Sequence, residues 1–139
     1  MWPFFSYTDL IWIRGAYAVI LKENGYDMKF SDSLKKNNDF RNVYKCGRSY
    51  ANKYLVMYVL ENNMEINRLG ISVSKKVGNS IVRHRVTRLV RESYRLHEDI
   101  FNSGLDIVVV ARNSASSVSY AEVESALLHL GRLHHIIGS

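Results

Sequence analysis

The sequence predicts an α+β sandwich in which helices and strands surround one core. Three observations support this fold class. The chain has 139 residues, 47% hydrophobic and 23% charged, which is typical of a single globular domain. Apolar residues recur at helical spacing in three stretches, and runs rich in aromatic and β-branched residues lie between them. The order helix, strands, helix, strand, helix gives a four-stranded sheet if a short strand forms near Arg48–Tyr50.

Residues 1–27 differ from the rest of the chain. They contain the only proline and both tryptophans, and Arg14 and Gly15 interrupt their apolar run at 10–21. The run is too short to span a membrane, and it lacks the basic flank of a signal peptide. Our hypothesis is that Met28 is the natural start, that 28–139 form the domain, and that 1–27 are an upstream extension.

A short helix opens the domain. Asn37 or Asn38 begins it, and we expect Gly47 to end it as a C′ residue. Helical spacing places three large side chains on one face of this helix: Phe40, Val43 and Tyr44.

A β-hairpin follows, with strands at Tyr54–Leu60 and Arg68–Val73 and a turn over Glu61–Glu65. Alternation puts the aromatic side chains of the first strand on one face. An aromatic stripe is more often core than binding surface. A neighbouring cation and small residues would instead form a shallow groove of the kind that binds single-stranded RNA, so both interpretations stay open. The residues of this face are Tyr54, Val56, Tyr58, Arg68, Gly70 and Ser72.

The stretch Ser74–Glu92 carries the strongest functional signal. We expect Gly78 to permit a positive φ, and Asn79 or Ser80 to cap a helix that reaches about His97. From Lys75 to Arg95 the chain has seven Lys or Arg and one acid, and like charges at i,i+3 and i,i+4 repel each other. Such a face favours an anionic partner, and guanidinium groups suit phosphates. One arc of the helix is apolar, with Val82, Val86, Leu89, Val90 and Leu96, and the opposite arc is basic, with His84, Arg85, Arg88, Arg91, Arg95 and, at its margin, Arg83.

The last elements are a strand and a helix. Leu105–Ala111 is apolar on both faces, which predicts a buried strand. Ser119 and Glu122 form a capping box for a final helix.

The charge is unevenly distributed. The net charge is +6, made up of −1 over residues 1–27, +10 over 28–95 and −3 over 96–139. A basic segment of this kind is typical of nucleic-acid binding. The single cysteine, Cys46, cannot form an internal disulfide and favours a cytoplasmic location. No metal-binding or nucleophile motif is present in the sequence.

The basic stretch also resembles the signature of a known family, the protein component of bacterial ribonuclease P, which runs roughly S-K-K-x-G-N-A-x-x-R-N-R-x-K-R-x-x-R-E. The chain departs from this pattern at Ser80, His84 and Thr87. The matching residues are Ser74, Lys75, Lys76, Gly78, Asn79, Arg83, Arg85, Arg88, Arg91 and Glu92.

The resemblance implies a fold and an activity. The fold is αβββαβα with a left-handed βαβ crossover through the arginine-rich helix, whereas spacing alone favours the usual right-handed connection. The activity is endonucleolytic 5′ maturation of tRNA by a ribonucleoprotein whose RNA subunit, with Mg²⁺ bound mainly by that RNA, performs the catalysis. The protein would have no catalytic or metal-binding residue and no membrane partner. The alternative is a basic RNA-binding or ribosome-associated module without enzymatic activity.

The resemblance also implies two sets of binding residues. The catalytic RNA subunit would contact Lys75, Lys76, Asn79, Arg83, Arg85, Arg88 and Arg91. The 5′ leader of precursor tRNA would contact Phe40, Tyr44, Val56 and Tyr58, with Arg68 beside them.

Overall fold

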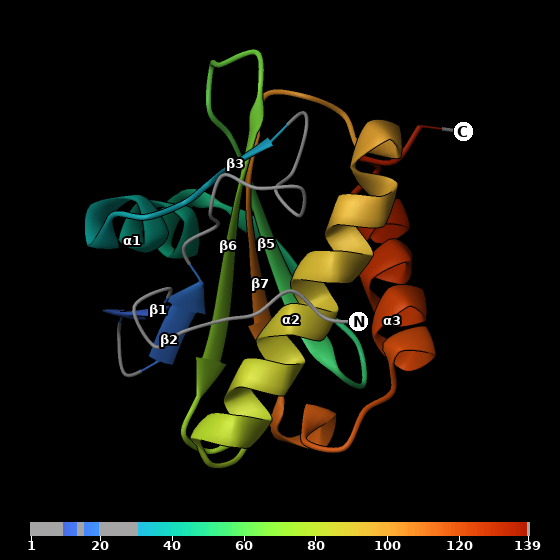
Figure 1. Cartoon of the computed structure of the whole chain (residues 1–139). Coiled ribbons are helices and arrows are strands. Elements are labelled where there is room, and N and C mark those ends of the chain that lie inside the picture. Colours follow the sequence, from blue (N-terminus) through green and yellow to red (C-terminus); the bar gives the residue numbers. More distant parts are fainter. Residues whose placement is uncertain (1–9, 14–15, 20–30, 139) are drawn as a thin grey trace.

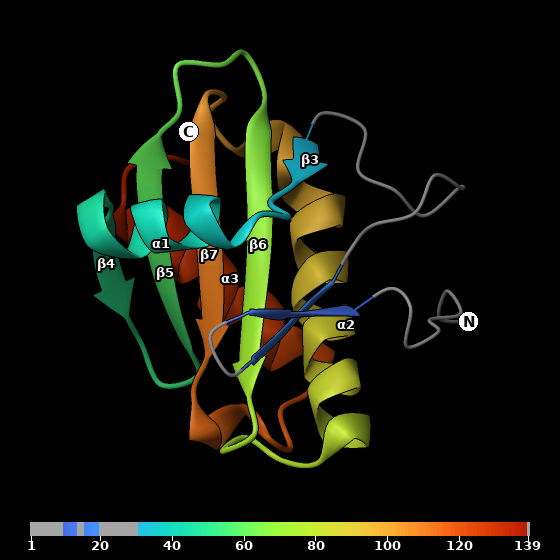
Figure 2. The ribbon, with the colours of Figure 1, turned by 90° about the vertical axis from the view of Figure 1, so that its left-hand side faces the viewer.

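The computed structural model describes residues 10–13, 16–19 and 31–138. A mixed sheet divides the molecule into two layers, with α1 on one face and α2 and α3 on the other (Figures 1 and 2). Two short 3₁₀ helices, η2 (Glu98–Ile100) and η3 (Asn113–Ala115), lie in the connections. The helices are α1 (Asn37–Cys46), α2 (Ser80–His97) and α3 (Tyr120–Leu133). The strands are β1 (Leu10–Ile13), β2 (Ala16–Val19), β3 (Ser31–Ser33), β4 (Arg48–Ala51), β5 (Leu55–Glu61), β6 (Asn67–Ser74) and β7 (Leu105–Ala111).

The central sheet has the strand order β3-β6-β7-β5-β4. Strands β4, β5 and β7 pair antiparallel, whereas β6 is parallel to both β7 and β3. The predicted α+β fold is therefore confirmed, with one correction: the sheet has five strands rather than four. The extra strand, Ser31–Ser33, is only three residues long and polar, so its sequence lacks the alternating pattern of a strand.

The connection from β6 to β7 runs through α2. Both strands point the same way, and α2 lies behind the sheet when α1 faces the viewer (Figure 2). In that view both strands point down and β7 lies to the left of β6, so the connection through the helix behind them is left-handed. The expectation drawn from the family resemblance is confirmed, and the general preference for right-handed crossovers does not hold here.

Two hydrophobic cores lie on the two faces of the sheet, rather than the one core that the sequence predicts. The larger one lies under α2 and α3, and it includes Leu55, Met57 and Val59 from β5. The smaller one lies under α1 and contains Leu34, Phe40, Val43 and Val108. Strand β7 contributes to both cores, which confirms the prediction that it is buried on both faces.

Several predicted helix ends are confirmed. Asn79 caps α2 by accepting a hydrogen bond from the Val82 amide at 3.0 Å. Ser119 and Glu122 form the expected capping box of α3.

The prediction of a positive φ at Gly78 is wrong, whereas Gly47 ends α1 as expected, although its φ is also negative. Gly47 has an extended backbone with φ −76°, and a Cβ there would lie 2.5 Å from the Val43 carbonyl oxygen. A Cβ at Gly78 would lie 2.7 Å from the Val82 side chain. Close approach, rather than backbone conformation, therefore explains both glycines.

Part of the segment 1–27 lies within the described residues. Strands β1 and β2 form an antiparallel hairpin, and β2 pairs with the end of β6 through Ala16↔Ser74 and Tyr17↔Val73. Residues 1–9, 14–15 and 20–30 lie outside the described residues, so the hypothesis of a start at Met28 stays a prediction. Across the described part of the chain, no helix is long and apolar enough to cross a membrane.

The small core predicts a stability effect at Gly70. A Cβ at this position would lie 2.5 Å from Cζ of the buried Phe40 ring. We expect Gly70→Ala to lower the free energy of unfolding by about 1–3 kcal/mol in urea denaturation, because overpacking displaces the ring. Gly138→Ala is the control, since its nearest neighbour would be 3.5 Å away. Equal stability of the two variants would contradict this packing.

Candidate nucleic-acid interface

The turn before α2 presents polar and basic groups together. Lys75, Lys76 and Asn79 are exposed beside the first turn of the helix. The backbone N–H groups of a helix N-terminus carry a partial positive charge and bind anions. Arg83 reinforces the turn by donating from Nη1 to the Gly78 carbonyl oxygen at 3.0 Å. The end of α2 is therefore a rigid, positively charged corner.

The arginines of α2 are not equivalent. Arg83 and Arg91 are 7% and 3% exposed, whereas Arg85 and Arg88 are half-buried. Arg85 donates from Nη2 to the Val118 carbonyl oxygen, so its guanidinium group is held in one place. Partial burial lowers the pKa of Arg88 from its usual value. The most accessible part of the predicted basic face therefore consists of Arg85 and Arg88 with the two lysines.

One core position of α2 differs from the sequence prediction. Leu96 is 53% exposed and Tyr94 is fully buried, so Tyr94 takes the core position assigned to Leu96. Glu92 accepts a hydrogen bond from Arg95 Nε at 3.1 Å. Thr87, which replaces the lysine of the family pattern, is buried, and its hydroxyl donates to the Arg83 carbonyl oxygen at 2.7 Å.

A second candidate surface lies on the other face of the sheet, beside α1. Tyr44 and Tyr58 are half-buried and meet edge to face, with ring centroids 5.0 Å apart. Val56 is also half-buried and lies two residues before Tyr58 on β5. Tyr54, left open by the sequence, packs instead against the larger core, and its hydroxyl donates to Glu122 at 2.6 Å. The surface is a shallow aromatic face between α1 and β5, which we call the α1 cleft.

Phe40 requires a correction. It is predicted from the resemblance as a direct contact, but its exposed fraction is 0%. Its ring lies against Gly70 and Leu34 in the small core. Phe40 therefore supports the α1 cleft from below and has no ring face available for a base.

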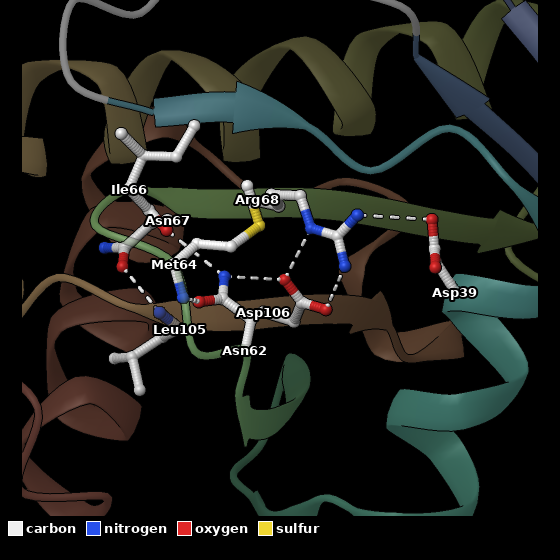
Figure 3. A network of polar contacts seen from close by, with 8 residues as sticks. All are labelled: Asp39, Asn62, Met64, Ile66, Asn67, Arg68, Leu105 and Asp106. Carbon is white, nitrogen blue, oxygen red and sulfur yellow. Dashed lines mark hydrogen bonds and ion pairs between the residues drawn. The ribbon is translucent and has the colours of Figure 1, made fainter.

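Arg68 lies beside the α1 cleft in a network of polar contacts (Figure 3). Its Nε and Nη2 donate to the two oxygens of Asp106 at 2.8 and 2.6 Å, and its Nη1 donates to Asp39 at 3.3 Å. The hydrogen bond to Asp106 raises the pKa of Arg68. Asn62 also donates to Asp106, at 3.0 Å. Because two carboxylates offset its charge, Arg68 joins α1 to the sheet more than it attracts phosphate.

Asp39 and Asp106 are not among the site residues predicted from the sequence. Asp106 is buried in β7, and it is the only charged residue within that apolar strand. Because carboxylates are rarely buried unless they are paired, the single aspartate in an apolar strand could have indicated this network from the sequence. Among the described residues, no group of three or more His, Cys, Asp or Glu side chains could hold a metal ion.

The network predicts unequal effects of two isosteric substitutions. Asp106 is buried and accepts three hydrogen bonds, whereas Asp39 is more exposed and accepts one longer bond from Arg68. We expect Asp106→Asn to lower the free energy of unfolding by about 2 kcal/mol. Asp39→Asn, the matched control, should lower it by less than about 1 kcal/mol. Urea denaturation of the full chain checks both values, and a larger effect at Asp39 would contradict the assignment of Asp106 as the principal partner.

Comparisons with known proteins agree on one family. The model of the family described as Ribonuclease P matches residues 28–134. The ribonuclease P protein component of Lachnoclostridium phytofermentans is 65% identical over 109 residues, which cover 78% of this chain and 94% of that protein. The component of Alkaliphilus metalliredigens is 54% identical, covering 79% and 99% of the two chains.

Solved structures give the same result. The RNase P protein of Staphylococcus aureus matches with a TM-score of 0.71 and 36% identity, over 76% of this chain and 97% of that one. The RNase P protein of Thermotoga maritima matches with a TM-score of 0.67 and 35% identity, over 73% and 96%.

Proposed function

The chain belongs to the ribonuclease P protein family, and from this premise we propose that its two surfaces bind two different RNAs. As a ribonuclease P protein component it is a subunit of an endoribonuclease ribonucleoprotein, and its partner is an RNA subunit. We assign that RNA to the basic face of α2 and the 5′ leader of precursor tRNA to the α1 cleft. The non-enzymatic RNA-binding module is not favoured.

The observation that carries the first assignment is the basic corner at the start of α2. Lys75, Lys76 and Asn79 are exposed there, and the helix N-terminus adds its own donors. Arg85 and Arg88 continue the positive charge along the helix. We include the more buried Arg83 and Arg91 as residues that hold this face in shape. Folded RNA presents closely spaced phosphates, which a rigid row of guanidinium groups can bind.

The second assignment rests on the aromatic face of the α1 cleft. Tyr44 and Tyr58 present partly exposed rings on which unpaired bases can stack without strong sequence preference. Val56 extends the apolar floor, and Phe40 holds it from below. We assign Arg68 a positioning role here, because its bonds to Asp106 and Asp39 fix α1 against the sheet.

We further propose that the chain supplies no catalytic side chain. The described residues contain no set of acidic or histidine side chains suited to a resident Mg²⁺ ion. The Mg²⁺ that the family uses would be held mainly by the RNA subunit, and the protein would offset phosphate repulsion between the two RNAs. A cytoplasmic location, where precursor tRNA is made, is part of the same proposal.

The basic face of α2 can be tested by its effect on binding of the RNA subunit. Replacing both Arg85 and Arg88 by Ala removes two guanidinium groups from the basic face. We expect weaker binding of the RNA subunit and a log–log salt dependence flatter by about 1 per lost phosphate contact. Filter binding over a range of salt concentrations measures this slope. Arg132→Ala, an exposed arginine on α3, should leave the slope unchanged; a flatter slope in that control, or none in the double variant, would exclude the phosphate role.

The α1 cleft can be tested by its effect on binding of the 5′ leader. Tyr58→Ala should weaken holoenzyme binding of precursor tRNA about 5- to 150-fold, since a stacked base contributes ~1–3 kcal/mol. Binding of mature tRNA, which lacks the leader, should not change. Tyr54→Ala is the control, because Tyr54 lies outside the α1 cleft. An equal loss for precursor and mature tRNA would mean that Tyr58 serves only to stabilise the fold.

A further inference from the structure

A cavity of about 480 Å³ lies at the opposite end of the sheet from the Ser74–Asn79 turn. Its walls come from the start of β4, the end of β5 and the loop after it, the loop before β7, and the residues that directly follow α3. Alternation along β5 puts Glu61 on the same face as Met57 and Val59, which pack in the larger core. The cavity is therefore on the α3 side of the sheet and separate from the α1 cleft.

His134 is the most informative residue of this cavity. It is 1% exposed, and its Nε2 lies 2.8 Å from the Met57 carbonyl oxygen. A carbonyl only accepts hydrogen bonds, so Nε2 carries the proton and Nδ1 is the acceptor of a neutral ring. Burial lowers the pKa of His134, and the nearby Arg48 charge lowers it further. Among the described residues no group donates to Nδ1.

Buried acceptors without a donor are rare in folded proteins, and they require a specific explanation. His134 lines a cavity that is large enough for a small molecule or one nucleotide unit. A ligand that displaces the groups now shielding Nδ1 and brings its own N–H or O–H group would satisfy this atom. The histidine therefore indicates a ligand that donates hydrogen bonds.

The cavity wall also carries one cation and one anion. Arg48 lies opposite Val59 on the neighbouring strand, so it is a diagonal neighbour of Glu61 on the same face. Both side chains are exposed, and neither forms an ion pair with any described residue. Two opposite charges on one wall fit a ligand that has both an acceptor and donors on one edge.

This combination excludes several simpler ligands. A phosphate would meet the Glu61 carboxylate and the partially negative C-terminus of α3. A metal cation would meet the Arg48 guanidinium group. A nucleobase is neutral and can satisfy both groups at once. Guanine fits best, because its O6 accepts from a guanidinium group while its N1–H and N2–H₂ donate to a carboxylate.

An aromatic ring lies beside the cavity. Tyr50 is 44% exposed, and its ring centroid is 4.7 Å from that of His134 in an edge-to-face arrangement. Tyr50 follows Arg48 by two residues on β4, so both side chains lie on the same face. Its exposed ring is a surface on which a base can stack.

We propose that this cavity binds a guanine base of single-stranded RNA, with Glu61 and Arg48 reading its edge and His134 accepting a hydrogen bond. The site is a third RNA contact, and it does not depend on the assignment of the α1 cleft or the basic face of α2. It gives the protein a base preference that neither of those surfaces supplies.

The test uses the full chain and fluorescein-labelled decauridine with one central G or, in its place, one central A. The other surfaces bind both oligonucleotides equally, so only the ratio of affinities matters. We expect the G oligonucleotide to bind about tenfold more tightly. Glu61→Gln replaces one acceptor oxygen by a donor and should abolish this ratio. Glu65→Gln, an exposed glutamate outside the cavity wall, should preserve it.

A second measurement reads His134 directly. In protein labelled with ¹⁵N-histidine, the Nδ1 resonance of His134 should shift on addition of the G oligonucleotide and not of the A oligonucleotide. An equal affinity for both oligonucleotides, a ratio unaffected by Glu61→Gln, or an unchanged Nδ1 resonance would each overturn the proposal. If guanosine monophosphate shifts the resonance while the G oligonucleotide does not, the ligand is a free nucleotide and the RNA assignment is wrong.

Discussion

The ion pair between the half-buried Arg68 and the buried Asp106 holds the other elements in place. It joins β6 to β7 near the start of both strands, and each of its groups has a further partner. Arg68 also donates to Asp39 on α1, and Asp106 accepts from Asn62 in the loop after β5 (Figure 3). One buried carboxylate therefore fixes the helix that borders the α1 cleft and the loop at the end of the sheet. A buried charge without its partner raises the free energy of the folded state. Arrangements of these elements that leave Asp106 unpaired are therefore unfavourable.

The left-handed crossover explains how one small domain presents the two separate surfaces that we propose to bind RNA. The chain leaves β6, forms the basic corner around Lys75 and Asn79, and returns to β7 on the α2 side of the sheet. The other side is left for α1 and the aromatic face of Tyr44 and Tyr58. The five-stranded sheet lies between the two surfaces, so the anionic partners assigned to them are kept apart. The guanine site proposed at the end of the sheet is distinct from both, because its residues lie where α3 ends.

Much of the fold could be predicted because its signals are local. The apolar strand Leu105–Ala111, the capping box at Ser119 and the helix after Asn79 depend on residues close in sequence, and the structure confirms them. The sequence predictions were wrong where residues distant in the sequence determine whether a side chain is buried or paired. Phe40 is buried because Gly70, 30 positions away, leaves room for its ring. Tyr94 rather than Leu96 is buried because its hydroxyl meets Ser31 and Asn67. Arg68 was predicted as a cation facing RNA because its partners, Asp39 and Asp106, belong to other elements.

Directed hydroxyl-radical cleavage can show whether the two faces of the sheet contact two different RNAs. Cys46 is the only cysteine and is exposed at the end of α1, so an iron chelate can be attached there without mutation. Ile81, 75% exposed at the start of α2, provides the second position through Ile81→Cys combined with Cys46→Ser. In the holoenzyme with precursor tRNA, the chelate on Cys46 should cleave the 5′ leader and the chelate on α2 the RNA subunit. Cleavage of the same RNA from both positions, or the reverse pattern, would contradict the account.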